Sequence, residues 1–182
     1  MTRLRLALTA LTLVGFGGAS ASPIAVAQAP AAKCYGQAAT QSGTKGADIL
    51  HGTSDTDVIV GKAGNDEILG LGARDYLCGG PGDDNMSGSA GKDIMQGGPG
   101  ADIVTGITGN DDVSGGRGRD AVIGGGGSDA ILGGRGRDYV NGVDGRVRND
   151  TVDGGPGHDF CEADGTIDNS DSFPRCEGTE LQ

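Results

Sequence analysis

One apolar side chain recurs every nine residues along most of the chain, and the residues around it are small or polar. The recurring apolar positions are Leu50, Ile59, Ile68, Leu77, Met86, Met95, Val104, Val113, Val122, Ile131, Val140, Val152 and Cys161. The residue before each of them varies freely, as at Glu67, Tyr76 and Asn85, which is typical of an outward-facing position. This pattern predicts a short strand over the last three residues of each nonapeptide, as in the segments 102–105 and 120–123, each of which begins with the aspartate that precedes the strand.

A glycine begins each nonapeptide, and a second glycine usually stands at the fourth place. The first glycines are Gly43, Gly52, Gly61, Gly70, Gly79, Gly88, Gly97, Gly106, Gly115, Gly124, Gly133, Gly142 and, after three extra residues in 142–150, Gly154. Glycine reaches backbone conformations closed to other residues, so these positions predict a tight turn before each strand. A helix is excluded because each glycine would cost about 1 kcal/mol relative to alanine.

The sixth place of every nonapeptide is aspartate. The residues are Asp48, Asp57, Asp66, Asp75, Asp84, Asp93, Asp102, Asp111, Asp120, Asp129, Asp138, Asp150 and Asp159. Stacked strands lie about 4.8 Å apart, so aspartates in adjacent layers repel unless a cation lies between them. Calcium takes six to eight oxygens from carboxylates and backbone carbonyls, and a glycine turn followed by aspartate offers both. The repeats therefore predict a ladder of Ca²⁺ sites.

The pattern Gly-Gly-x-Gly-x-Asp-x-aliphatic-x resembles the RTX, or haemolysin-type, calcium-binding nonapeptide repeats. Full six-residue matches begin at Gly79, Gly97, Gly115, Gly124, Gly133 and Gly154, and residues 43–162 carry the repeats. The resemblance implies an all-β fold: a right-handed parallel β-roll (a β-solenoid) with two nonapeptides per coil. It also implies that calcium lies between turns stacked on the same side, held by aspartate carboxylates and turn carbonyls.

With two nonapeptides per coil, alternate turns stack in two columns that differ in sequence. The turns starting at 43, 61, 79, 97, 115, 133 and 154 all keep glycine at the fourth place, whereas the other column has Asp55 and Ala73 there. We expect a nearly complete calcium ladder in the first column, with up to six ions in the six gaps between seven turns, and a sparser one in the second. The expected calcium-binding residues are Asp48, Asp66, Gly80, Gly82, Asp84, Asp93, Gly98, Gly100, Asp102, Asp111, Gly116, Gly118, Asp120, Gly125, Gly127, Asp129, Gly134, Gly136, Asp138, Gly155, Gly157 and Asp159.

Composition and charge narrow the class of protein. The 182 residues include 38 glycines, no tryptophan and three each of tyrosine and phenylalanine, too few aromatic residues for an ordinary globular core. One elongated repeat domain is expected instead. The net charge of −11 becomes −13 if Arg3 and Arg5 are removed, and it argues against nucleic acid or an anionic membrane as partner.

The N-terminus is typical of a secretory signal. Arg3 and Arg5 precede an apolar run over 4–18 that is too short for a comfortable membrane span, although an uncleaved anchor is the alternative. We expect a signal peptide over 1–27, with cleavage after Ala27 or Ala21, a secreted, extracellular protein, and no membrane contact after cleavage. Residues 28–42 are expected to form an N-terminal cap or tether. Residues 163–182, which lose the period, are expected to cap the other end of the solenoid.

Four cysteines in an exported chain indicate two disulfides, and three pairings are possible. We favour Cys161 with Cys176, a short loop that would hold the C-terminal segment, and Cys34 with Cys78, which would fix the segment before the repeats. Free thiols are the alternative. Zinc binding is disfavoured because the chain has no Cys-x-x-Cys pair.

The sequence carries no catalytic constellation. His51 and His158 are the two histidines, they lie in distant repeats, and neither Gly-x-Ser-x-Gly nor His-Glu-x-x-His occurs. We therefore expect a non-enzymatic secreted protein whose β-roll folds when Ca²⁺ binds, since two aliphatic side chains per coil offset little of the entropy of ordering it. A solenoid that is stable without metal is the alternative for folding. For function, the alternative is a calcium-dependent adhesion or matrix protein, with a protein or glycan partner that the sequence does not identify.

Overall fold

The chain divides into a first unit, Met1–Pro30, and a second unit, Ala31–Gln182. The structure, a computed structural model, describes residues 31–144, 150–163, 166–167 and 176, all within the second unit. The predicted signal peptide over 1–27, most of the predicted C-terminal cap over 163–182 and the centre of the insertion in 142–150 lie outside the described residues. The signal peptide and the C-terminal cap stay predictions.

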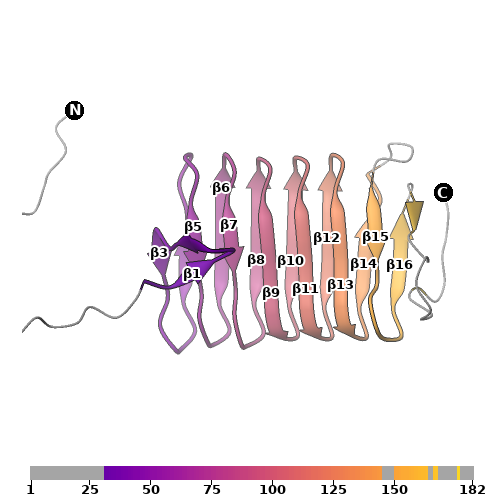
Figure 1. Cartoon of the computed structure of the whole chain (residues 1–182), viewed down its shortest axis with the longest axis horizontal. Coiled ribbons are helices and arrows are strands. Elements are labelled where there is room, and N and C mark those ends of the chain that lie inside the picture. Colours follow the sequence, from indigo (N-terminus) through magenta and orange to yellow (C-terminus); the bar gives the residue numbers. More distant parts are fainter. Residues whose placement is uncertain (1–30, 145–149, 164–165, 168–175, 177–182) are drawn as a thin grey trace, which may run out of the picture. The chain divides into compact units, whose positions relative to one another are not determined.

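The second unit consists of two parallel sheets that face each other along their whole length (Figure 1). Among the described residues there is no helix of the length and apolar character needed to cross a membrane. The eight-stranded sheet contains β3 (Gln41–Ser42), β5 (Val58–Val60), β7 (Tyr76–Cys78), β9 (Ile94–Gly100), β11 (Asp112–Gly118), β13 (Ala130–Gly136), β15 (Thr151–Asp153) and β17 (Thr166–Ile167). The seven-stranded sheet contains β4 (Ile49–His51), β6 (Glu67–Gly72), β8 (Asn85–Ala90), β10 (Ile103–Thr108), β12 (Ala121–Gly126), β14 (Tyr139–Gly142) and β16 (Phe160–Ala163).

Successive strands alternate between the two sheets, so each coil contains two nonapeptides. Each residue pairs with the residue eighteen positions later, as Val104 does with Val122 across β10 and β12. Pairs that span the insertion have an offset of twenty-one, as between Ile131 and Val152, and the pair of β15 with β17 has an offset of fifteen, as between Thr151 and Thr166. The predicted fold class, an all-β parallel β-roll, is confirmed.

The core is a single file of side chains between the sheets. All thirteen apolar residues at the eighth place of the repeats are buried, and most of them, such as Leu77 and Val104, have no exposed surface. The first-place glycines let the chain close over this file: a Cβ added at Gly106 would lie 2.5 Å from the carbonyl oxygen of Gly124 in the next layer. The inward orientation predicted for the eighth place is therefore correct.

The strands in the middle of the roll are longer than predicted. β9, β11 and β13 each span seven residues, because the ladder continues through the glycines of the following turn. In β11 and β13, Gly116 still pairs with Gly134. The prediction of three-residue strands was wrong here because it assigned those glycines to the turn alone.

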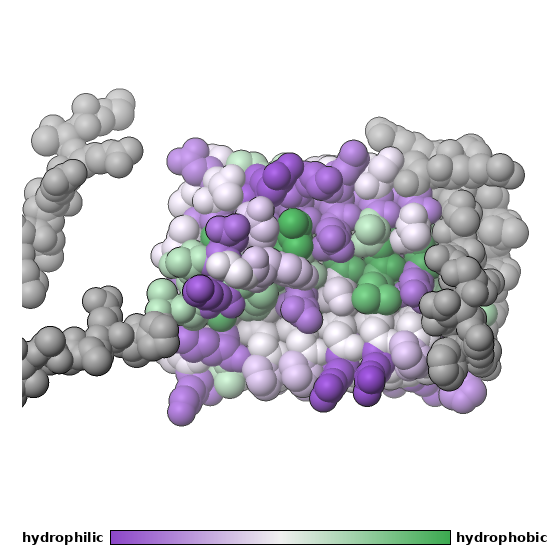
Figure 2. All heavy atoms as spheres, in the orientation of Figure 1, coloured by the Kyte–Doolittle hydropathy of each residue, from purple (hydrophilic) through white to green (hydrophobic). Residues whose placement is uncertain are grey.

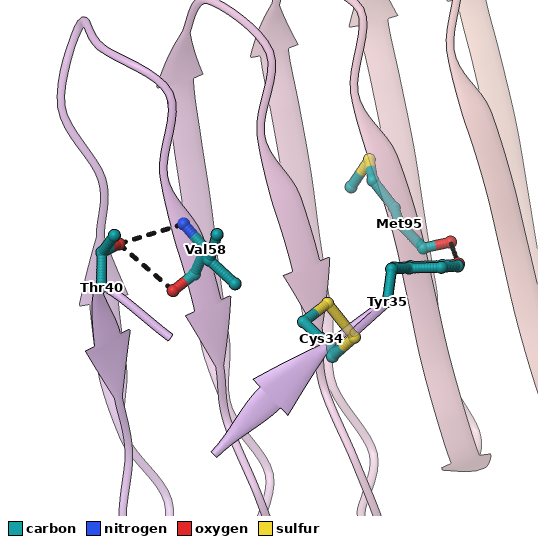
Figure 3. The surroundings of a disulfide bond; sticks show 6 residues. Cys34, Tyr35, Thr40, Val58 and Met95 are labelled. Atoms are coloured by element: carbon teal, nitrogen blue, oxygen red, sulfur yellow. Dashed lines mark hydrogen bonds between the residues drawn. A yellow bond between two sulfur atoms is a disulfide. The ribbon is translucent and has the colours of Figure 1, made fainter. Parts of the chain in front are cut away.

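A short antiparallel hairpin of β1 (Lys33–Cys34) and β2 (Gln37–Ala38), which we call the N-terminal hairpin, packs on the outside of the eight-stranded sheet. Its Cys34 forms a disulfide with Cys78 in β7, and the Tyr35 hydroxyl donates a hydrogen bond to the carbonyl oxygen of Met95 at 3.3 Å (Figure 3). Val58 and Val60, which flank an inward residue, are buried under this hairpin. The hairpin therefore adds a second, smaller apolar cluster to the roll.

The second disulfide joins Cys161 in β16 to Cys176, with the two Cα atoms 5.3 Å apart. Cys161 stands at the eighth place of the last repeat and takes the role of the buried aliphatic residue there. Both favoured cysteine pairings are confirmed.

Candidate calcium-binding turns

The turns between the two sheets stack in two columns on opposite edges of the roll (Figure 1). The turns that follow strands of the eight-stranded sheet, starting at 43, 61, 79, 97, 115, 133 and 154, form the first column. Those that follow strands of the seven-stranded sheet form the second. Each turn ends with its sixth-place aspartate, so each column contains one aspartate per layer.

From the second turn of each column onward, one carboxylate oxygen of the aspartate joins it to the layer before. Its Oδ1 accepts a hydrogen bond from the backbone N–H of the aspartate one layer earlier, at 2.8–2.9 Å in every case. In the first column these bonds run without interruption from Asp48 to Asp159, and in the second from Asp57 to Asp150. The sixth-place aspartates thus form two continuous ladders.

The other carboxylate oxygen, Oδ2, is buried and has no hydrogen-bond donor in eleven of the aspartates, counted among the described residues. These are Asp66, Asp75, Asp84, Asp93, Asp102, Asp111, Asp120, Asp129, Asp138, Asp150 and Asp159. None of the eleven residues is more than 3 % exposed. A buried ionised carboxylate without a partner is costly, so each Oδ2 requires either a proton or a cation.

Burial raises the pKa of ten of these carboxyl groups: Asp66, Asp75, Asp84, Asp93, Asp102, Asp111, Asp120, Asp129, Asp138 and Asp159. The pKa reaches about 6 for Asp75, Asp84, Asp93, Asp111, Asp120 and Asp159, and about 7 for Asp102. Loss of solvation is the main cause, the hydrogen bond from the neighbouring backbone N–H lowers the pKa, and for these seven a nearby aspartate adds a smaller rise. The calcium-free roll therefore holds its aspartates in an environment that disfavours their charge.

The backbone of each turn presents carbonyl oxygens to the next layer. Gly98 and Gly100, at the second and fourth places, have φ angles of 126° and 155°. A Cβ added at Gly100 would meet the carbonyl oxygen of Gly82 in the preceding turn and would lie 3.3 Å from Oδ1 of Asp102. The same combination of a carbonyl oxygen and an aspartate Oδ1 surrounds Gly91, Gly109, Gly136 and Gly157. Only a residue without a side chain leaves this oxygen-lined space open.

These oxygens suit calcium better than a metal that requires several side-chain ligands. Among the described residues, no three His, Cys, Asp or Glu side chains converge on one point. The carboxylates are instead spaced one per layer with turn carbonyls between them, and calcium accepts both kinds of oxygen. The donor set therefore fits Ca²⁺.

A sequence profile of the RTX calcium-binding nonapeptide repeat, which contains four copies, matches residues 42–77, 51–86, 79–111, 105–140 and 143–168. The chain belongs to the RTX calcium-binding repeat family. No curated protein sequence matches it as a relative. Membership of this family identifies the repeats as calcium-binding. The geometry of the individual turns indicates which residues could hold the ions.

In the turns starting at 70, 88 and 106, the second column differs in sequence from the first but has the same positive φ at the second place. Leu71, Ser89 and Ile107, at the second place in the second column, have φ angles of 82°, 79° and 84°, in the region that favours glycine. Ala73, at the fourth place, has a φ of 70°. The backbone at the second place is thus alike on both edges in these turns. A sparser ladder in the second column stays a prediction.

The first RTX turn of each column satisfies its aspartate within the protein. Oδ2 of Asp48 accepts hydrogen bonds from the backbone N–H and the hydroxyl of Thr44, at 2.6 and 3.0 Å. Thr53 does the same for Asp57 at 2.7 and 2.9 Å. In addition, the Lys62 ammonium donates a hydrogen bond to the carbonyl oxygen of Gly43 at 2.6 Å, which places a positive charge in the first gap.

The predicted set of calcium-binding aspartates differs from the set of buried aspartates without a donor at Oδ2 in three residues. Asp48 was included although Thr44 satisfies its carboxylate, whereas Asp75 and Asp150 were left out although each has a buried Oδ2 without a donor. Their sixth-place phase was the signal that could have identified them. All other predicted aspartates lie in the two ladders. The predicted glycines Gly80, Gly82, Gly98, Gly100, Gly116, Gly118, Gly125, Gly127, Gly134, Gly136, Gly155 and Gly157 lie at second and fourth places of the turns.

Proposed function

We propose that this RTX protein is a secreted, non-enzymatic calcium-binding protein whose β-roll folds when Ca²⁺ enters the gaps between stacked turns. The observation that carries the proposal is the row of eleven buried Oδ2 atoms without hydrogen-bond donors. Divalent cations between the layers would compensate these charges and complete their shells with turn carbonyls. No other group among the described residues supplies this compensation along the whole ladder.

The ions would lie between adjacent turns of the same column. In the first column, Asp84, Asp102, Asp120, Asp138 and Asp159 would each contribute a carboxylate, and the second- and fourth-place residues of the preceding turn would contribute carbonyl oxygens. The Lys62 ammonium at Gly43 makes the first gap the least favourable for an ion. Bound calcium would supply positive charge and flexible oxygen coordination, and its proposed role is structural.

Calcium binding would be coupled to folding. Without a cation, adjacent layers bring carboxylates together in a buried environment, and the narrow core contains one apolar side chain per nonapeptide. Binding energy then becomes folding energy, as in other proteins in which the metal site exists only in the folded state. The two disulfides restrict the unfolded chain and lower the amount of binding energy required.

Two features support an extracellular setting. Residues 1–27 have the charge and apolar pattern of a signal peptide. The four cysteines form two disulfides, which persist in oxidising compartments. Free calcium would be abundant enough there to load sites of modest affinity.

The experiment is a calcium titration of the disulfide-intact chain from residue 28, followed by far-UV circular dichroism. We expect a cooperative transition from coil to β structure with Ca²⁺ and no equivalent transition with Mg²⁺ at the same concentration, since Mg²⁺ demands rigid octahedral geometry. A chain that is already β-rich in chelator and does not respond to calcium would refute the coupling.

A further inference from the structure

Two adjacent turns of the first column have the same hexapeptide, Gly-Gly-Arg-Gly-Arg-Asp, at 115–120 and 133–138. Arg117 and Arg135 occupy the third place and pair in register across β11 and β13. Parallel strands are about 4.8 Å apart, so this register places two positive charges in neighbouring layers. Both side chains are exposed. Among the described residues neither guanidinium group has an ion-pair or hydrogen-bond partner.

These two arginines line a groove of about 420 Å³ on the eight-stranded sheet. Gln96 and Ser114 add hydrogen-bonding side chains, and Leu132, Pro99 and Pro156 add apolar surface. No acidic residue lines the groove, on a chain whose net charge is −11. Figure 2 shows hydrophilic side chains at the lower rim, where β11 and β13 end, and a hydrophobic area higher on the same face.

The second pair of arginines in the same hexapeptides lies in different surroundings. Arg119 and Arg137 line a groove beside the seven-stranded sheet, together with Asp102, Asp120 and Asp138 of the aspartate ladder. The two grooves thus differ in local charge although they share the same two turns. An anion is favoured where arginines stand without carboxylates, which is the groove of Arg117 and Arg135.

We propose that the groove of Arg117 and Arg135 binds an acidic polysaccharide, through the sulfate or carboxylate groups of its sugar units. Arginine forms bidentate, charge-assisted hydrogen bonds with such oxyanions. The groove is open and crosses β9, β11 and β13, which suits a linear polymer, and its apolar residues can contact the C–H faces of sugar rings. Single-stranded nucleic acid is disfavoured because it needs aromatic stacking residues, and none lines the groove.

This inference goes beyond calcium binding, and it gives the adhesion alternative a specific chemical basis. It requires the folded roll but not a particular number of ions. A calcium titration followed by circular dichroism reports on folding, and a separate binding assay reports on the groove. Failure of either proposal is therefore visible independently.

The experiment measures binding of dextran sulfate, carboxymethyl dextran and neutral dextran to the calcium-loaded protein, by titration calorimetry or a surface-immobilised assay. We expect the sulfated or the carboxylated polymer, or both, to bind while neutral dextran does not. The double variant R117Q/R135Q should lose roughly tenfold or more in affinity, because each lost contact is a hydrogen bond to a charged group. Circular dichroism should show the same calcium transition as the parent protein, since both side chains are exposed.

The matched control is R119Q/R137Q, which removes the same charges from the same two turns but on the other side. We expect this variant to keep its affinity within about threefold, the size of a general charge effect. Equal losses in the two variants would mean that net charge alone attracts the polymer, and they would overturn the proposal. It would also be overturned if neither acidic dextran bound, if R117Q/R135Q bound normally, or if single-stranded DNA bound better and lost affinity in that variant.

Discussion

At the residue scale, the two oxygens of each inner aspartate have different environments. In Asp102, Oδ1 accepts a hydrogen bond from the backbone N–H of Asp84 at 2.8 Å, whereas Oδ2 is buried without a donor. Asp48 differs because Thr44 donates two hydrogen bonds to its Oδ2. A comparison of Asp102 with Asp48 therefore distinguishes the structural role of a sixth-place aspartate from its proposed role in binding calcium.

Replacement of Asp102 by asparagine should weaken calcium-induced folding. The amide oxygen can still accept the N–H of Asp84, but the charge proposed to face the ion is lost. We expect the calcium midpoint in circular dichroism to rise by roughly tenfold, the effect of removing one carboxylate from a site whose affinity depends on ligand charge. The matched variant Asp48→Asn should shift the midpoint by less than about twofold, because Thr44 already satisfies Asp48. Equal shifts in both variants would contradict the assignment.

The same carboxyl groups predict an unusual pH dependence of the calcium-free protein. Their pKa is about 6 in the folded roll, above the usual value of 3.8, so the folded state binds more protons than the unfolded state at intermediate pH. Stability without calcium should therefore fall as pH rises from about 4 to about 7, and it should be greatest below this window. Far-UV circular dichroism in chelator at pH 5 and pH 7.5 tests this: the β signal should be stronger at pH 5, where protonation of these carboxyl groups stabilises the folded state. A stronger β signal at pH 7.5 would show that these carboxylates are stabilised in the calcium-free state.

At the scale of the element, each turn requires residues that tolerate positive φ, and the second column meets this requirement poorly. Ile107 has a φ of 84° and a β-branched side chain that is 44 % exposed. In the first column, Gly116 has a φ of 118° at the equivalent place of its turn. The backbone strain of a non-glycine residue in this region is about 1–2 kcal/mol.

Substitution of Ile107 by glycine should stabilise the roll. The strain at this position is relieved, while loss of the half-buried side chain offsets part of this gain, so we expect a gain of up to about 1 kcal/mol in the free energy of unfolding with saturating calcium. The converse change, Gly100→Ala, should cost at least about 2 kcal/mol, because its Cβ would meet the carbonyl oxygen of Gly82 at a φ of 155°. Urea unfolding measures both. Loss of stability in the Ile107 variant would show that its side chain makes a contact that outweighs the strain.

The sequence was sufficient to predict the repeating layer of the roll, but not where the strands end or how the N-terminal end of the roll is covered. A nine-residue period with an apolar residue at the eighth place predicted the single-file core, and Val104 and Val122 pair and are buried as expected. The continuation of strands through Gly116 and Gly134 was missed because glycine indicates a turn and carries no strand signal of its own. The N-terminal hairpin has no period, and the apolar pair Val58 and Val60 beside an inward residue was the one local sign that something covers the sheet.

At the scale of the whole molecule, the N-terminal hairpin and its disulfide stabilise the first layers of the roll. The disulfide between Cys34 and Cys78 joins residues that are 44 positions apart in the sequence. It holds the hairpin over Val58 and Val60, which form a buried cluster with Cys34. The double variant C34S/C78S should lose about 2–4 kcal/mol in the free energy of unfolding, since the unfolded chain regains its freedom.

Hydrogen exchange locates this loss. Protection should fall most in β5 and β7, beneath the hairpin, and least in β13 and β15, further along the same sheet. A uniform loss of protection along the roll would instead mean that the layers unfold as one unit and that the hairpin has no local role.

The pairing offset of eighteen residues in most of the roll also determines which changes in length the molecule can absorb. Removal of eighteen residues would delete one complete coil and leave every later turn on its own edge, with the aspartates still in line. Removal of nine would move each later turn to the opposite edge and transfer the two arginine hexapeptides from the first column to the second. The three extra residues in 142–150 do neither, because the offset of twenty-one between Ile131 and Val152 absorbs them within a single turn. Whole coils of eighteen residues could therefore be added or removed, which would change the number of ion sites. The turns and surfaces of the later coils would keep their places on the roll.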